Sequence, residues 1–162
     1  MHIAIGADHA GVHLKAELVA FLAEGGHEVE DLGTTGDESV DYPDFGAAVG
    51  RAVAEGPAEV GVCVCGTGIG ISIAANKVPG VRAAVVHDVT SARMAKEHND
   101  ANVVCIGARL TGPQVAVEAL DTFLSSTWQA GRHARRIEKI AALEAAAASG
   151  SLGTGRPVGE RS

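Results

Sequence analysis

The chain has 162 residues, of which 46% are hydrophobic and 3% aromatic, and this length suits one compact domain with a sizeable core. Its net charge of −7 and the absence of a long basic run argue against a nucleic-acid surface spread over the whole domain. No apolar stretch is long enough to span a membrane, and three cysteines do not suggest a disulfide framework, so we expect a soluble, cytoplasmic protein.

Short apolar segments alternate with segments of helical periodicity along the chain. Residues 1–6 lack the basic and apolar segments of a secretory leader and instead begin the first strand. The expected strands cover residues 2–6, 27–32, 59–65, 81–86 and 102–107. The expected helices cover residues 12–22, 42–55, 69–77, 88–97, 111–125 and 128–148. Asp88 or Thr90 is the expected cap of the fourth helix.

The expected strands are continuous apolar runs, which is typical of a parallel sheet covered on both faces. We therefore predict a doubly wound, Rossmann-like α/β fold with a five-stranded parallel sheet and helices on both faces. Residues 1–148 are expected to form a single domain, and residues 149–162 a disordered tail rich in glycine, serine and proline. In such folds, ligands bind beyond the carboxyl ends of the strands, near the point where strand order reverses.

The central stretch, residues 65–70, follows a buried strand and places three glycines at alternate positions before a helix. The free N–H groups and positive dipole of a helix N-terminus attract an anion. Cys65 opens this turn, and a thiol at a helix N-terminus loses its proton more easily than a free thiol. The stretch therefore offers an anion cradle beside a candidate base or nucleophile, although a small buried cysteine is more often structural.

Several other types of site fit this glycine loop poorly. A dinucleotide fingerprint needs a third glycine where Ile71 stands, and it follows the first strand rather than the third. Lys77 lies too far along the chain for a Walker loop. Cys63 and Cys65 have no matching histidine pair for zinc, and a redox pair is more often spaced C-x-x-C. The loop alone therefore favours a small anion, such as a phosphate or an enediolate oxygen.

Polar residues follow other expected strands as well. Asp8 and His9 follow the first strand and Arg109 follows the fifth, so all three share an edge with the glycine loop. His98 and Asn99 precede the fifth strand and belong to the opposite edge, from which they could reach a site only across a dimer interface. Arg132 and Arg136 share a helix face, where they could bind a phosphate or simply lie on a solvated surface. Arg109 is a third candidate ligand for the same anion.

Five motifs stand out in combination: GADHAG at 6–11, DYP at 41–43, CGTGIGISIAANK at 65–77, HNDAN at 98–102 and GRHARR at 131–136. Together they resemble the type B ribose-5-phosphate isomerases, and the resemblance covers roughly residues 1–146. The same superfamily holds galactose-6-phosphate isomerase subunits and relatives that use allose 6-phosphate. The resemblance implies interconversion of D-ribose 5-phosphate and D-ribulose 5-phosphate through an enediolate, in the pentose phosphate pathway, with neither cofactor nor metal.

The resemblance also implies a role for each matching residue. Cys65 matches the base that moves a proton between C1 and C2, Thr67 the hydroxyl that assists it, and His98 the acid that opens the furanose ring. The implied sugar contacts are Asp8, His9, Asn99 and the loop residues Gly66, Gly68, Ile69 and Gly70, and the implied phosphate ligands are Arg109, Arg132 and Arg136. A second branch of the family has a glutamate base at the position of Ile71, so this chain follows the cysteine branch.

The family is dimeric, with each site built from two subunits, which would bring His98 to the glycine loop. We therefore expect a homodimer, or a tetramer, that binds a small sugar phosphate. Three alternatives stay open: an isomerase for six-carbon sugar phosphates such as allose 6-phosphate or galactose 6-phosphate, a non-catalytic phosphosugar-binding module, and a redox-sensing role for Cys65.

Overall fold

The structure is a computed structural model that describes residues 1–151. The chain forms two compact units, Met1–Gln129 and a second that begins at Ala130. Our expectation of a single domain over residues 1–148 stays a prediction, and most of the expected tail, residues 152–162, lies outside the described residues. None of the helices in the described part of the chain is long and apolar enough to cross a membrane.

One parallel sheet of five strands forms the centre of the first unit, in the order β2-β1-β3-β5-β4. The strands are β1 (His2–Ala7), β2 (Glu28–Asp31), β3 (Val60–Cys65), β4 (Ala83–Val86) and β5 (Val103–Gly107). Strands β3 and β5 are buried at every position, as expected for the middle of a sheet covered on both faces. The prediction of a doubly wound five-stranded parallel sheet is confirmed.

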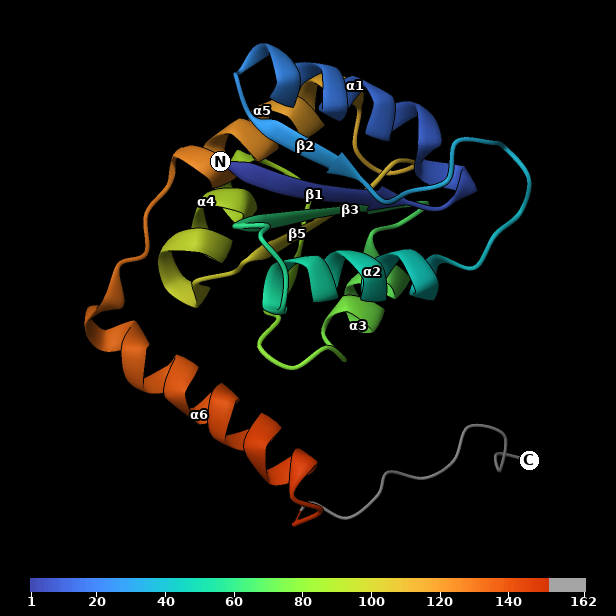
Figure 1. Ribbon diagram of the computed structural model, residues 1–162. Helices are drawn as coiled ribbons and strands as arrows, with labels where there is room; N and C mark the ends of the chain where they lie inside the picture. Colours follow the sequence, from blue (N-terminus) through green and yellow to red (C-terminus); the bar gives the residue numbers. More distant parts are fainter. Residues whose placement is uncertain (152–162) are drawn as a thin grey trace. The chain divides into compact units, whose positions relative to one another are not determined.

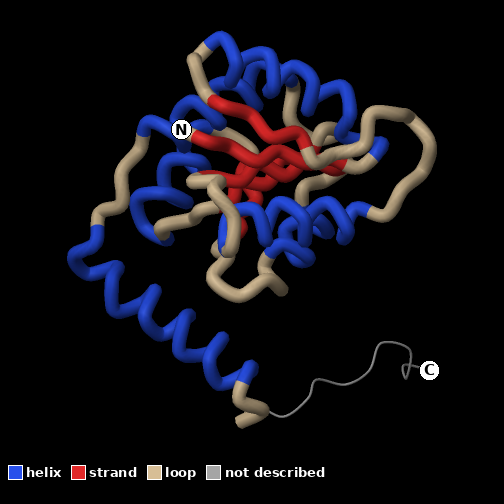
Figure 2. Tube along the Cα trace, viewed as in Figure 1, coloured by secondary structure: helices blue, strands red, loops and turns tan. Residues whose placement is uncertain are grey.

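Helices cover both faces of this sheet, as Figure 2 shows with the strands lying between two helical layers. The elements are the 3₁₀ turn η1 (His9–Gly11) and helices α1 (Val12–Glu24), α2 (Tyr42–Ala54), α3 (Ile69–Ala75), α4 (Val89–Asn99), α5 (Pro113–Ser125) and α6 (Ala130–Ala148). Helices α1, α4 and α5 pack on one face around Leu18, Leu120 and Phe123. Helices α2 and α3 cover the other face through Val49 and Ile71 (Figure 1).

The strand order places a crevice at the carboxyl ends of β1 and β3. The chain leaves β1 for β2 on one side and then returns to β3 on the other, so strand order reverses between these two neighbours. In register, Ala7 lies beside Val64, which aligns the ends of the two strands. The loops that follow β1 and β3 diverge from this point, and open α/β sheets bind their ligands there.

Several boundaries differ from the expected ones by one or two residues, and two of these differences have a visible local cause. Strand β4 begins at Ala83 rather than residue 81, because Val81 donates its N–H to the carbonyl of Val78 in a turn. The last helix begins at Ala130 rather than residue 128, and its backbone is not helical at Gly131 (φ 35°, ψ −127°). Of the two expected caps of α4, Asp88 is the one used, and the Ser91 N–H that it accepts holds the pKa of its carboxyl below the usual value.

Candidate active site

A cavity of about 390 Å³ opens at the crevice between β1 and β3. Its lining combines a thiol, a carboxylate, an imidazole and a guanidinium from three different strand ends. The residues that line it are Asp8, His9, Ala10, Tyr42, Cys65, Gly66, Thr67, Ile69, Gly70 and Arg109. The structure therefore brings together most of the candidate residues that the sequence places at one edge of the sheet.

Cys65 lies at the inner end of this cavity as the last residue of β3 and is only 4% exposed. Its Sγ accepts a hydrogen bond from the backbone N–H of Gly68 at 3.1 Å. Gly68 itself does not line the cavity, and its left-handed backbone, with φ 75° and ψ −17°, is a conformation that glycine adopts readily. The loop thus directs a hydrogen-bond donor at the sulfur atom that faces the cavity.

Tyr42 is a site residue that the sequence reasoning did not assign. It begins α2, yet its ring reaches across to the glycine loop and lines the cavity. A Cβ atom built on Gly70 would lie 2.6 Å from two ring carbons of Tyr42, closer than real side chains approach. The Tyr42 ring thus occupies the space that a side chain at position 70 would fill.

Asp8 and His9 follow β1 and are held in place by backbone groups. The carboxylate of Asp8 accepts the N–H groups of Ala10 and Gly11, at 3.0 and 3.2 Å, as the cap of the short η1 turn. His9 Nδ1 accepts the N–H of Val40 at 3.2 Å. An acceptor at Nδ1 places the proton of the neutral ring on Nε2, which leaves that N–H as a donor.

Arg109 and Thr67 complete the polar lining. Arg109 follows β5, and its side chain lies against Gly66, where an added Cβ would be 3.5 Å from the guanidinium carbon. The N–H of Arg109 also donates to the carbonyl of Gly66 at 3.0 Å, which ties the two loops together. Thr67 is exposed, and its Oγ1 accepts the N–H of Ile69 at 3.3 Å. A positive charge therefore stands beside the glycine loop.

Two further thiols lie beneath the site, in the core. Cys63 and Cys105 are neighbours in the register of β3 and β5, fully buried, and remain free thiols like Cys65. The hydrogen bond with Cys63, together with burial, raises the pKa of the Cys105 thiol well above its usual value. Within residues 1–151, His, Cys, Asp and Glu side chains form no group of three or more that could hold a metal ion.

His98 and Asn99 are not brought to this cavity within one copy of the chain. Both lie in the last turn of α4, which leads into the start of β5. The start of β5 lies beside the start of β3, at the edge of the sheet opposite to Cys65. The expectation that these residues belong to the opposite edge is confirmed, and any role at a glycine loop requires a second copy.

Arg132 and Arg136 lie on α6, in the second unit. The Arg132 Nε donates to Nε2 of His133 at 3.3 Å, and Nη1 of Arg136 lies 3.4 Å from Nδ1 of the same ring. The three side chains thus form one basic cluster with the imidazole between two guanidinium groups. Such a pair of guanidinium groups, four residues apart on a helix, suits a phosphate.

Comparisons with known proteins identify the family of the chain. The sequence profile described as "Ribose/Galactose Isomerase" matches residues 3–140. The chain is 46% identical to ribose-5-phosphate isomerase B of Escherichia coli over 88% of this chain and 95% of that protein. It is 43% identical to galactose-6-phosphate isomerase subunit LacB of Clostridium acetobutylicum over 86% of this chain and 80% of that protein.

A solved structure of ribose-5-phosphate isomerase B from Clostridium thermocellum has the same fold. It is 53% identical in sequence and superposes with a TM-score of 0.88, over 90% of this chain and 98% of that one. The structure of the type B enzyme from Trypanosoma brucei is 50% identical, with a TM-score of 0.85 over 88% of this chain and 97% of that one. Sequence and fold therefore agree along nearly the whole described length, and the chain belongs to the ribose/galactose isomerase family.

Proposed function

We propose that this protein is an aldose–ketose isomerase that interconverts D-ribose 5-phosphate and D-ribulose 5-phosphate. The observation that carries the proposal is the placement of Cys65 at the inner end of the cavity, with its Sγ held by the N–H of Gly68 at 3.1 Å. Similar proteins from Escherichia coli and Clostridium thermocellum bear the name ribose-5-phosphate isomerase B. Three free thiols fit an enzyme of the reducing cytoplasm.

The proton transfer is assigned to Cys65. Its thiolate takes the proton from C2 of the open-chain aldose and leaves a 1,2-enediolate, and the same proton returns to C1 to give the ketose. The first-turn N–H groups of α3 have no acceptor within the helix and can stabilise the enediolate oxygens. The Thr67 hydroxyl lines the cavity, where it can pass a proton between O1 and O2.

The sugar and its phosphate are assigned to the other lining residues. The Asp8 carboxylate accepts hydrogen bonds from sugar hydroxyls, and the Nε2–H of His9 donates one beside it. Arg109 binds the phosphate. We also assign phosphate binding to Arg132 and Arg136, because their cluster on α6 presents two guanidinium groups. The carbonyl chemistry is thereby kept at the glycine loop, and the phosphate remains an anchor that takes no part in the reaction.

We assign ring opening to His98 and a sugar contact to Asn99, both contributed by a second copy of the chain. Two observations support a dimer with shared sites. His98 lies at the sheet edge opposite to Cys65, so one copy does not hold both residues in one site. Ile69, which lines the cavity, and Ile73 lie four residues apart on α3 and are 52% and 56% exposed. An exposed apolar helix face of this kind is typical of a surface that another protein covers.

A coupled assay with purified protein tests the proposal. We expect interconversion of ribose 5-phosphate and ribulose 5-phosphate, and a loss of at least about 10³-fold in kcat on Cys65→Ala with the circular dichroism spectrum unchanged. A fully active Cys65→Ala variant would refute the assignment of the base. Binding of ribose 5-phosphate without turnover by the wild-type protein would instead support a non-catalytic phosphosugar-binding module.

A six-carbon substrate is the second candidate, because the chain is 43% identical to a galactose-6-phosphate isomerase subunit. The same assay with allose 6-phosphate and galactose 6-phosphate distinguishes the two. We expect the highest kcat/KM with ribose 5-phosphate. A higher value with either six-carbon sugar would replace the pentose assignment and keep the enediolate chemistry of Cys65.

A further inference from the structure

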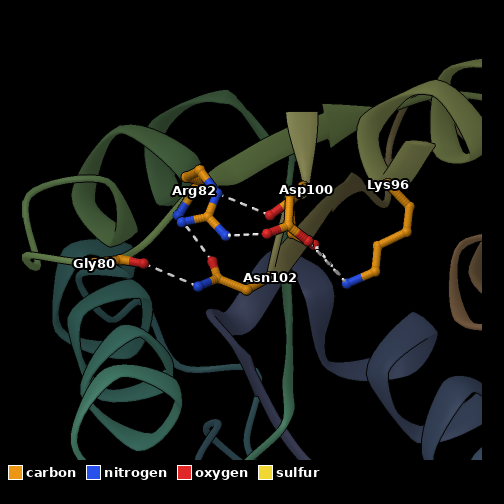
Figure 3. A network of polar contacts seen from close by, with 6 residues as sticks. Gly80, Arg82, Lys96, Asp100 and Asn102 are labelled. Carbon is orange, nitrogen blue, oxygen red and sulfur yellow. Dashed lines mark hydrogen bonds and ion pairs between the residues drawn. The ribbon is translucent and has the colours of Figure 1, made fainter. Parts of the chain in front are cut away.

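The turn that ends α4 is held by a network of polar contacts at the amino-terminal edge of the sheet (Figure 3). Arg82 donates from Nε to the carbonyl oxygen of Asp100 and from Nη2 to its Oδ2, both at 2.8 Å. One guanidinium therefore binds the backbone and the side chain of a single residue. The two side chains are only 28% and 33% exposed, which shields this ion pair from much of the solvent.

Asp100 has an unusual backbone conformation that needs such support. Its φ of 45° and ψ of 43° lie in the left-handed region, and among the described residues it is the only one with a positive φ that is not glycine. A residue with a Cβ keeps this conformation when the surrounding contacts fix it. Lys96 adds to them, with Nζ 3.7 Å from Oδ1 of Asp100 and donating to the carbonyl of Ala101 at 3.4 Å.

Arg82 is itself fixed by the side chain of Asn102. The Asn102 Oδ1 accepts the backbone N–H of Arg82 at 2.8 Å, and its Nδ2 donates to the carbonyl of Gly80 at 2.9 Å. The backbone N–H of Asn102 donates in turn to the carbonyl of Arg82 at 3.2 Å. The amide thus locks the segment before β4 to the segment before β5, and the guanidinium extends from a rigid base.

We infer that Arg82 is a positioning residue, which fixes Asp100 and thereby sets the direction of His98 and Asn99. The inference rests on the proposed function, in which these two residues act in the site of a second copy. His98 and Asn99 immediately precede Asp100 at the end of α4, so any change in the turn moves both. Proton transfer tolerates little misplacement of the acid, and a planar guanidinium presents its donors in a rigid fork, whereas those of lysine rotate on a flexible stem.

A pair of measurements separates the ring-opening step from the proton transfer at Cys65. Ribose 5-phosphate reaches the enzyme as a furanose, and opening it requires an acid. Ribulose 5-phosphate cannot close a furanose ring, because its C5 oxygen carries the phosphate. Exchange of its C1 proton with D₂O, followed by nuclear magnetic resonance, therefore requires the base and the glycine loop but not His98.

We expect Arg82→Gln to lower kcat for ribose 5-phosphate about tenfold and to leave the D₂O exchange of ribulose 5-phosphate within about twofold of wild type. His98→Gln should show the same selective loss, and Arg82→Lys a smaller one. Arg51→Gln, which removes an exposed charge from α2, is the matched control and should change neither rate. Asp100→Asn removes the charge of the same contact, tolerates the left-handed backbone, and tests the inference if Arg82→Gln does not fold.

The possible outcomes separate the inference from the proposed function. Equal losses in both assays for Arg82→Gln, or no loss in either, would overturn the positioning role. Either of these results for Arg82→Gln, together with a selective loss in His98→Gln, would leave the proposed function intact. A wild-type protein that does not isomerise ribose 5-phosphate, or a Cys65→Ala variant that still exchanges the C1 proton, would overturn the proposed function itself.

Discussion

The backbone N–H of Gly68 donates to Sγ of Cys65 at 3.1 Å, and Gly68 itself has a left-handed backbone at φ 75°. A Cβ atom at this position would also lie 3.0 Å from the carbonyl carbon of Ile106 in β5. A residue with a side chain would thus move the loop away from the sulfur. The space for one glycine is therefore linked to the hydrogen bond that the Cys65 sulfur accepts.

We expect Gly68→Ala to lower kcat for ribose 5-phosphate by about 10- to 100-fold, because the N–H donor moves away from the sulfur and the loop loses its alignment. Steady-state kinetics together with the rate of Cys65 alkylation by iodoacetamide measure the effect. Gly36→Ala is the control, since an added Cβ there meets nothing within 4 Å. Wild-type kcat and alkylation rate in Gly68→Ala would contradict the role of this hydrogen bond.

Much of this site follows from the sequence, because parallel strands end at one edge and carry their next residues there. Asp8, Cys65 and Arg109 each lie at the end of a strand or within two residues of it, so the order of elements alone places them together. Tyr42 could not be placed in this way, since its ring reaches the loop from another helix. Its signals in the sequence are its place in the motif DYP at 41–43 and the absence of a side chain at Gly70.

The contacts that hold Asp100 were likewise beyond prediction from the sequence. Asn102 stands in the motif HNDAN, but its bonds to Arg82 and Gly80 join segments more than 18 residues apart in the chain. Such pairings depend on how β4 and β5 align, and periodicity carries no information on alignment. The role of His98 could not be predicted from the order of elements either, because it depends on a second copy of the chain.

We expect Gly70→Ala to destabilise the protein by about 1–3 kcal/mol, because the added Cβ overlaps the Tyr42 ring and forces it out of place. Urea denaturation measures the free energy of unfolding. In a Tyr42→Ala background the same substitution should cost much less, since the ring is gone. Equal costs in the two backgrounds would show that the contact between Gly70 and Tyr42 is not the cause.

The ion pair between Lys15 and Asp31 offers a test of stability away from the cavity of the active site. Lys15 is 3% exposed, and its Nζ binds Oδ1 and Oδ2 of Asp31 at 2.7 and 2.6 Å. Asp31→Asn leaves a buried ammonium without its counter-charge. We expect a loss of about 2 kcal/mol in urea denaturation, below the roughly 3–5 kcal/mol of a fully buried pair, because Asp31 is 38% exposed.

Asp37→Asn is the matched control for this pair, since Asp37 lies 3.6 Å from His13 with both side chains exposed. We expect it to change the free energy of unfolding by less than about 0.5 kcal/mol. Lys15→Met should cost less than Asp31→Asn, because it removes the buried charge and keeps the apolar stem. The reverse order of the Lys15→Met and Asp31→Asn losses would contradict the reasoning.

The raised pKa of the Cys105 thiol predicts how stability depends on alkaline pH. The unfolded thiol has a pKa of about 8.5, whereas the hydrogen bond with Cys63 and burial favour the neutral thiol in the folded protein. The stability that the buried neutral thiol contributes is therefore complete below about pH 8.5 and is lost as pH rises toward the folded pKa. Urea denaturation from pH 8 to 10 should show wild type losing about 1 kcal/mol per pH unit more than Cys105→Ala above about pH 8.5, and parallel curves would refute the shift.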